Sequence, residues 1–227
     1  MPKIARVLFD LDGTLFSSEN LLEPAYRDGI EEFGTESGET YRCPTRAEIL
    51  REVGRPANEI MKHFFGELPE ARRAELGRRI LRHICRRIRN REGDLFSGVP
   101  EMLKRLRGEG RRLYLVSNCR RSYLDAVLDT YDLRSFFEEM ACNEEYPDLG
   151  KNGLVKSFSS AGEAVLVGDR SSDGEAAREA GIFWIGCAYG YSSANESELR
   201  EADCVVESVF EIPEAVGFLE GKEKKRL

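Results

Sequence analysis

The sequence has no hydrophobic run long enough to cross a membrane and no low-complexity tract. Its N-terminal apolar stretch, residues 4–9, is interrupted by Asp10 and Asp12, whereas a membrane helix needs roughly 20 apolar residues. Long Pro, Ser or Gln tracts are also missing, which excludes a collagen-like or wholly disordered chain. We therefore expect a soluble, cytoplasmic protein with a packed core.

Cysteine and histidine are sparse, and each scarcity excludes a class of site. Any two of the six cysteines lie at least 17 positions apart, so neither a CxxC redox pair nor a Cys-rich zinc site is built locally. We expect reduced thiols. The sequence has two histidines, His63 and His83, but no nucleophile-elbow motif, so a Ser-His-Asp triad is not indicated.

The chain also has little excess charge. It contains 34 basic and 41 acidic residues and a net charge of −7, which argues against non-specific nucleic-acid binding. Residues 70–92 are the exception, with nine arginines and three glutamates. We interpret this stretch as the solvated face of an amphipathic helix in preference to an RNA-binding surface.

Short apolar runs that end abruptly at polar residues predict a parallel β-sheet. Such runs cover residues 7–9, 112–116 and 164–168, and each reads as a strand buried on both faces. Further strands are predicted at 182–187 and 204–206, with helices at 100–109, 122–131, 154–159 and 173–180. This alternation predicts an α/β fold with a doubly wound, Rossmann-like parallel sheet.

An insertion is predicted after the first strand. About a hundred residues separate the first two strands, far more than the dozen or so that one crossover needs. The intervening residues show helical patterns, and the last places Leu76, Ile80, Ile84 and Ile88 at four-residue spacing. We predict that residues 1–16 and 94–227 form a catalytic core. Residues 17–93 are predicted to form an inserted helical cap domain.

Polar side chains follow three of the predicted strands. Asp10, Ser117 and Asp169 fall where an open α/β sheet binds its ligands. Asp12 lies two residues after Asp10, before a glycine that permits a sharp turn. Because neighbouring carboxylates repel one another, a hard divalent cation is their usual partner. We predict a Mg²⁺ site formed by Asp10, Asp12, Asp169 and Asp173.

These residue types fit phosphoryl transfer to an enzyme carboxylate. Asp10 is the predicted nucleophile, and Asp12 is the predicted acid that protonates the leaving oxygen and then the base that activates water. Ser117 and Asn118 are predicted to donate hydrogen bonds to phosphoryl oxygens.

A lysine is expected to complete the charge balance of this site. Lys151 is the first choice because it precedes a short helix that leads into the strand of Asp169. Lys156 is the alternative.

These segments resemble, in order, the four motifs of the haloacid dehalogenase-like hydrolase superfamily: Asp10-Leu11-Asp12-Gly13-Thr14, Ser117-Asn118, Lys151, and Gly168-Asp169-Arg170-Ser171-Ser172-Asp173. The insertion resembles the helical cap of phosphoglycolate phosphatase-like and β-phosphoglucomutase-like members. The resemblance implies a Mg²⁺-dependent phosphatase with Asp10 as nucleophile, and the presence of Asp12 disfavours dehalogenase and phosphonatase chemistry. The chain departs from the usual pattern at Asn152, where a proline often follows the lysine.

The cap is expected to select the substrate. The turn at residues 52–56 resembles the cap loop that faces the active site, so Arg55 is a candidate to bind a substrate carboxylate or second phosphate; a plain surface arginine is the alternative. We expect a small phosphorylated metabolite, either phosphoglycolate-like or a sugar phosphate, no membrane or nucleic-acid partner, and a monomer or homodimer. A phosphosugar mutase of the β-phosphoglucomutase type and a non-catalytic binding protein remain alternatives.

Overall fold

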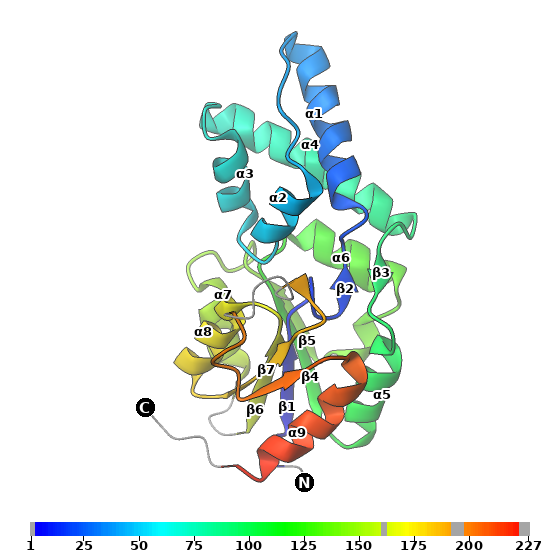
Figure 1. Cartoon of the computed structure of the whole chain (residues 1–227), viewed down its shortest axis with the longest axis vertical. Coiled ribbons are helices and arrows are strands. Elements are labelled where there is room, and N and C mark those ends of the chain that lie inside the picture. The colour runs from blue at the N-terminus through cyan, green and yellow to red at the C-terminus, as the bar shows by residue number, and fades with distance from the viewer. Residues whose placement is uncertain (1–2, 160–162, 192–197, 223–227) are drawn as a thin grey trace.

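The computed structural model describes residues 3–159, 163–191 and 198–222. Its centre is a six-stranded sheet in the order β5-β4-β1-β6-β7-β8, in which every neighbouring pair is parallel (Figure 1). The strands are β1 (Arg6–Phe9), β4 (Arg112–Ser117), β5 (Glu139–Cys142), β6 (Ala164–Gly168), β7 (Phe183–Cys187) and β8 (Cys204–Val206). The predicted doubly wound α/β fold is confirmed.

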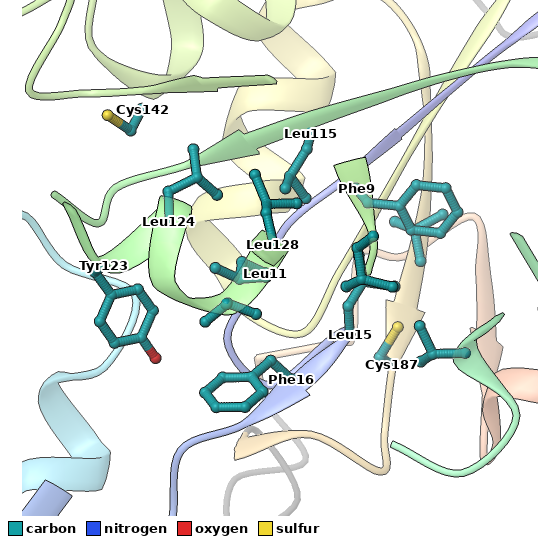
Figure 2. Close-up of a cluster of buried hydrophobic side chains, with 14 of the residues drawn as sticks. Phe9, Leu11, Leu15, Phe16, Leu115, Tyr123, Leu124, Leu128, Cys142 and Cys187 are labelled. Atoms are coloured by element: carbon teal, nitrogen blue, oxygen red, sulfur yellow. The ribbon is translucent and has the colours of Figure 1, made fainter. Parts of the chain in front are cut away.

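Helices cover both faces of the sheet, because successive residues of a strand point to opposite sides. In β1, Leu8 packs into one apolar cluster, whereas Val7 and Phe9 pack into the other. The Leu8 side is covered by α7 (Gly150–Phe158) and α8 (Ser171–Ala180). The Phe9 side is covered by α5 (Val99–Gly108), α6 (Arg121–Thr130) and α9 (Ile212–Glu220). Figure 2 shows the packing on that side, where Leu124 and Leu128 of α6 lie near Leu11 and Leu115.

One strand of the sheet differs from the sequence prediction. β5, with the residues Glu139-Met140-Ala141-Cys142, was not predicted because its three apolar residues include no β-branched or aromatic side chain. It lies at the edge of the sheet, where its pairing partner among the described strands is β4. The predicted strands at 182–187 and 204–206 correspond to β7 and β8.

Four helices lie between β2 (Phe16–Ser17) and β3 (Asp94–Leu95), beyond the carboxyl ends of the parallel strands (Figure 1). They are α1 (Leu22–Ser37), α2 (Arg46–Glu52), α3 (Ala57–Phe65) and α4 (Glu70–Arg89). We call residues 17–93 the helical insertion. Strands β2 and β3 pair with each other in antiparallel fashion where the chain enters and leaves it. That the insertion forms a separate cap domain stays a prediction.

The arginine-rich helix α4 turns its charges toward the acidic residues of α1. Its four predicted apolar residues, Leu76, Ile80, Ile84 and Ile88, are all buried. Arg79 pairs with Glu32, at 3.4 Å, and with Glu36, while Arg86 and Arg87 pair with Asp28 at 3.0 and 2.8 Å. The local excess of positive charge is therefore largely neutralised within the chain. Across the described residues, no helix combines the length and apolar character needed to span a membrane.

Candidate active site

The polar residues predicted at the strand ends meet at one edge of the sheet. Strand β1 lies between β4 and β6, and its register places Phe9 beside both Leu115 and Val167. The amide nitrogen of Asp10 donates a hydrogen bond to the carbonyl of Val167 over 2.9 Å, which continues the ladder past the end of β1. Asp10 and Asp169 therefore follow β1 and β6, and Ser117 ends the adjacent β4, at the same carboxyl edge.

Asp10 forms a buried ion pair with Lys151. Asp10 is 3% exposed and Lys151 is 6% exposed; the lysine Nζ donates to Asp10 Oδ1 and lies 2.6 Å from Asp173 Oδ1. Burial raises the pKa of Asp10 to about 7, although the neighbouring ammonium opposes this shift. Burial alone would lower the pKa of Lys151, but attraction to Asp10 and Asp173 raises it above its ordinary value. Lys156 is exposed on α7, away from this contact.

Three carboxylates with a single lysine beside them form a cluster suited to a divalent cation. Oxygen atoms of Asp10, Asp169 and Asp173 all lie within 4.8 Å of one another. Oδ1 of Asp169 is buried without a hydrogen-bond partner among the described residues. Burial, followed by repulsion from Asp173 and Asp10, raises the pKa of Asp169 well above its ordinary value. The donor set is all oxygen and has a net charge of −2 with Lys151 included, which fits Mg²⁺.

Close packing of the backbone shapes this cluster. Gly13 has φ of +77°, a conformation that side chains rarely adopt, and a Cβ there would collide with the carboxylate of Asp169. The backbone nitrogen of Tyr191 donates to Asp169 Oδ2 over 2.8 Å. Glycine at position 13 therefore lets the loop after β1 approach the carboxylate that follows β6.

The carboxylate of Asp12 lies outside this cluster and contacts different groups. Its Oδ1 accepts a hydrogen bond from the hydroxyl of Tyr123 on α6. Burial raises the pKa of Asp12 to about 6, and the hydrogen bond from Tyr123 opposes that shift. A carboxyl group with such a pKa exchanges protons readily near neutral pH, as an acid and base must. The fourth metal-ligand role predicted for the Asp12 side chain stays a prediction.

Ser117 and Asn118 lie between the sheet and the helical insertion. The hydroxyl of Ser117 accepts a hydrogen bond from the backbone nitrogen of Cys119 over 3.2 Å, which leaves its own proton available for another acceptor. The amide group of Asn118 donates to the carbonyl of Gly54 over 2.8 Å. Asn118 thus links the end of β4 to the turn of the insertion that the sequence placed near the site.

Arg55 follows that turn and lines the same cavity as Asp10 and Asp12, a space of about 120 Å³ between the sheet edge and the insertion. Its guanidinium pairs with Glu52 at 2.6 Å and with Glu59 at 3.3 Å, and its side chain is 49% exposed. In this structure Arg55 reaches the cavity wall with its charge already paired.

The sequence analysis missed two tyrosines that contact the predicted site. Tyr123 lies at the start of α6 and is 111 positions from Asp12, which its hydroxyl contacts. Tyr191 binds Ser18 through its hydroxyl, 2.7 Å from the backbone nitrogen of Ser18. The available signal was positional: a helix that starts directly after a strand end presents its first turn to the same edge.

Comparisons with known proteins agree on one family. A family model described as haloacid dehalogenase-like hydrolase matches residues 7–187. A phosphoglycolate phosphatase of Vibrio parahaemolyticus is 27% identical over 223 residues, which cover 94% of this chain and 96% of that protein. A phosphoglycolate phosphatase of Caulobacter vibrioides is 27% identical over 93% of this chain and 90% of its own length. A predicted phosphatase from Clostridium acetobutylicum has a similar fold, with a TM-score of 0.78 at 20% identity and coverage of 94% of this chain and 98% of that one.

Proposed function

The chain belongs to the haloacid dehalogenase-like hydrolase family, and on that premise we propose that it is a Mg²⁺-dependent phosphatase acting on a small phosphorylated metabolite. The observation that carries the proposal is the buried Asp10 at the end of β1, paired with Lys151 and grouped with Asp169 and Asp173. Relatives named phosphoglycolate phosphatase, similar over nearly the whole chain, support the reaction class.

In the proposed reaction, a carboxylate oxygen of Asp10 attacks the phosphorus atom and the ester P–O bond breaks. Asp12 gives its proton to the departing oxygen, so an alcohol leaves and an aspartyl-phosphate remains on Asp10. Asp12 then accepts a proton from water, whose oxygen attacks the same phosphorus atom; the bond between phosphorus and the Asp10 oxygen breaks, which releases inorganic phosphate and restores the Asp10 carboxylate. The raised pKa of Asp12, about 6, suits a group that both donates and accepts this proton.

The remaining polar groups would hold the phosphoryl group during transfer. Lys151 would keep Asp10 ionised and offset the charge of the phosphoryl oxygens, while Ser117 and Asn118 would donate hydrogen bonds to them. Asp10, Asp169 and Asp173 would hold Mg²⁺, which when bound neutralises charge on the transferring group. The all-oxygen cluster supports this assignment.

We also propose that residues 17–93 act as a cap over the site. The hydrogen bond between Asn118 and Gly54 connects the insertion to the end of β4. Helices of the insertion and the end of β1 line one cavity together. A cap in this place would exclude water from the reacting groups and contact the leaving group.

The test is the release of inorganic phosphate, with and without Mg²⁺, from a panel that includes phosphoglycolate, hexose phosphates and p-nitrophenyl phosphate. Asp10→Asn keeps the size of the side chain but removes the nucleophile, and we expect it to lower kcat by at least roughly a thousandfold.

The matched control is Asp129→Asn, which changes an aspartate whose side chain is 63% exposed; it should retain wild-type activity. Phosphate release that survives in Asp10→Asn, or the absence of release from every ester by the folded wild type, would refute the proposed function.

A further inference from the structure

The cavity that contains Asp10 and Asp12 is apolar on the side of the helical insertion. Its lining comes from all four helices of the insertion and from the turn between α2 and α3. The side chains on that wall include Leu22, Ile49, Val53, Ile60, Met61 and Leu81. The leaving group of a phosphate ester held at Asp10 would extend toward this wall, because Asp10, Asp12 and these side chains share one cavity.

The charged groups along the cavity are already paired within the chain. Among the described residues of its lining, the cationic side chains are Arg55 and Arg120. Arg55 pairs with Glu52 and Glu59, and Arg120 pairs with Glu144 at 2.8 Å. A substrate carboxylate or second phosphate would compete with these glutamates for the N–H groups of a guanidinium whose charge they already offset.

The cavity has room for a small hydrocarbon group. Its volume of about 120 Å³ is similar to that of an apolar protein cavity of about 150 Å³ known to hold a benzene ring. An alkyl chain that moves from water into this cavity would contact aliphatic side chains. Each methylene buried in this way strengthens binding roughly fourfold. A hydroxyl group or carboxylate placed against the aliphatic side chains of this wall would lose its water without a partner there, since the polar side chains that the insertion adds to the lining are those of Ser18, Tyr26 and Arg55.

We infer that the phosphate monoester cleaved here has an apolar leaving group, either a short alkyl chain or a single aromatic ring. This inference rests on the proposed phosphatase activity and narrows its substrate class. It departs from the phosphoglycolate-like or sugar phosphate substrate expected from the sequence, since both carry polar atoms where the structure offers Leu81, Met61 and Val53.

The experiment measures kcat/KM with Mg²⁺ for methyl, ethyl, n-propyl and n-butyl phosphate, whose leaving alcohols have similar acidity. Phosphoglycolate serves as the polar counterpart of n-butyl phosphate because its leaving group has a similar size. We expect kcat/KM to rise at least about tenfold from methyl to n-butyl phosphate, since three fully buried methylenes would give roughly sixtyfold at fourfold each. n-Butyl phosphate should exceed phosphoglycolate by a similar factor.

A pair of variants on α4 tests whether this wall makes the contact. Leu81→Gln keeps a side chain of similar volume but adds an amide, and should lower the n-butyl to methyl ratio of kcat/KM at least about tenfold. Arg82→Gln changes the next residue, whose side chain is 62% exposed, and should leave that ratio unchanged. If Leu81→Gln does not fold by circular dichroism, Val53→Thr, of nearly the same shape, applies the same test.

The outcomes separate the inference from the function it rests on. A flat or falling alkyl series, a preference for phosphoglycolate, or an unchanged ratio in Leu81→Gln would overturn the apolar leaving group while leaving the phosphatase intact. A folded protein that releases phosphate from none of these esters, nor from p-nitrophenyl phosphate, would refute both.

Discussion

Replacing Asp169 by asparagine should stabilise the protein when divalent cations are removed. Lys151 pairs with Asp10 and Asp173, whereas Asp169 has no cationic partner of its own in the cluster. Its Oδ2 accepts the hydrogen bond from Tyr191, which the amide oxygen of asparagine can also accept. The substitution therefore removes a repelled negative charge and keeps the main polar contact.

The size of the effect follows from the spacing of the carboxylates. Two like charges within 4.8 Å of each other repel by at least about 3.5 kcal/mol at an effective dielectric constant of about 20. Removing one such repulsion corresponds to an increase in Tm of roughly 7–14 °C for a chain of this length. Because proton uptake by the wild type removes part of the repulsion, we expect Asp169→Asn to raise Tm by at least about 5 °C at pH 8 in EDTA.

The gain should depend on pH. Burial raises the pKa of Asp10 to about 7 from 3.8 and also raises that of Asp169, so the folded, metal-free wild type binds more protons than the unfolded chain. Its stability therefore falls as pH rises from about 4 toward 7 and above. The difference in Tm between Asp169→Asn and the wild type should accordingly be larger at pH 8 than at pH 5.

Thermal unfolding followed by circular dichroism, in EDTA and in Mg²⁺, checks this reasoning. Mg²⁺ should raise the Tm of the wild type and have little effect on Asp169→Asn. Asp173→Asn is the matched control, because Asp173 pairs with Lys151 and accepts a hydrogen bond from the backbone of Arg170 over 3.0 Å; it should be less stable than Asp169→Asn. If Asp169→Asn instead melts below the wild type in EDTA at pH 8, the carboxylates do not repel as argued.

Two further substitutions test the neighbouring groups. Tyr123→Phe keeps the ring beside Phe16 but removes the hydrogen bond to Asp12, and kcat should fall roughly tenfold. Because that hydrogen bond favours the ionised form of Asp12, its loss should move the limb of the pH–rate profile due to Asp12 to higher pH. An unchanged profile would contradict this. Lys151→Met leaves three buried carboxylates without a cation and should lower the free energy of unfolding in urea by about 3–5 kcal/mol. Lys156→Met, on the exposed side of α7, should change this free energy little. Equal effects of the two substitutions would refute the pairing of Lys151 with Asp10 and Asp173.

The strand ends were predictable from sequence because the signal is local. An apolar run followed at once by Asp10, Ser117 or Asp169 indicates a buried strand, and the polar residue indicates where that strand ends. Their convergence then follows from the parallel topology, in which the carboxyl ends of strands share an edge. Strand β5 lacked a clear signal, since its three apolar residues, Met140 to Cys142, include none of the β-branched or aromatic types that favour strands, and its place depends on pairing with β4.

Contacts between distant segments could not be read in the same way. The hydrogen bond from Tyr123 to Asp12 depends on how α6 packs beside β1, which no short pattern encodes. The pairing of Arg55 was more accessible, because Glu52 and Glu59 lie only three residues before and four residues after it in the sequence. The apolar wall of the cavity required the relative positions of four helices and could not be inferred from any one of them.

The antiparallel pairing of β2 with β3 makes the helical insertion a replaceable module. Phe16 lies opposite Leu95 and Ser17 opposite Asp94, so the chain leaves the sheet edge and returns to it at neighbouring points. Segments whose ends lie close together can be exchanged without disturbing the structure that receives them. If the insertion selects the leaving group, as proposed, that selection can diversify through residues 17–93 while the carboxylates after β1 and β6 keep their arrangement.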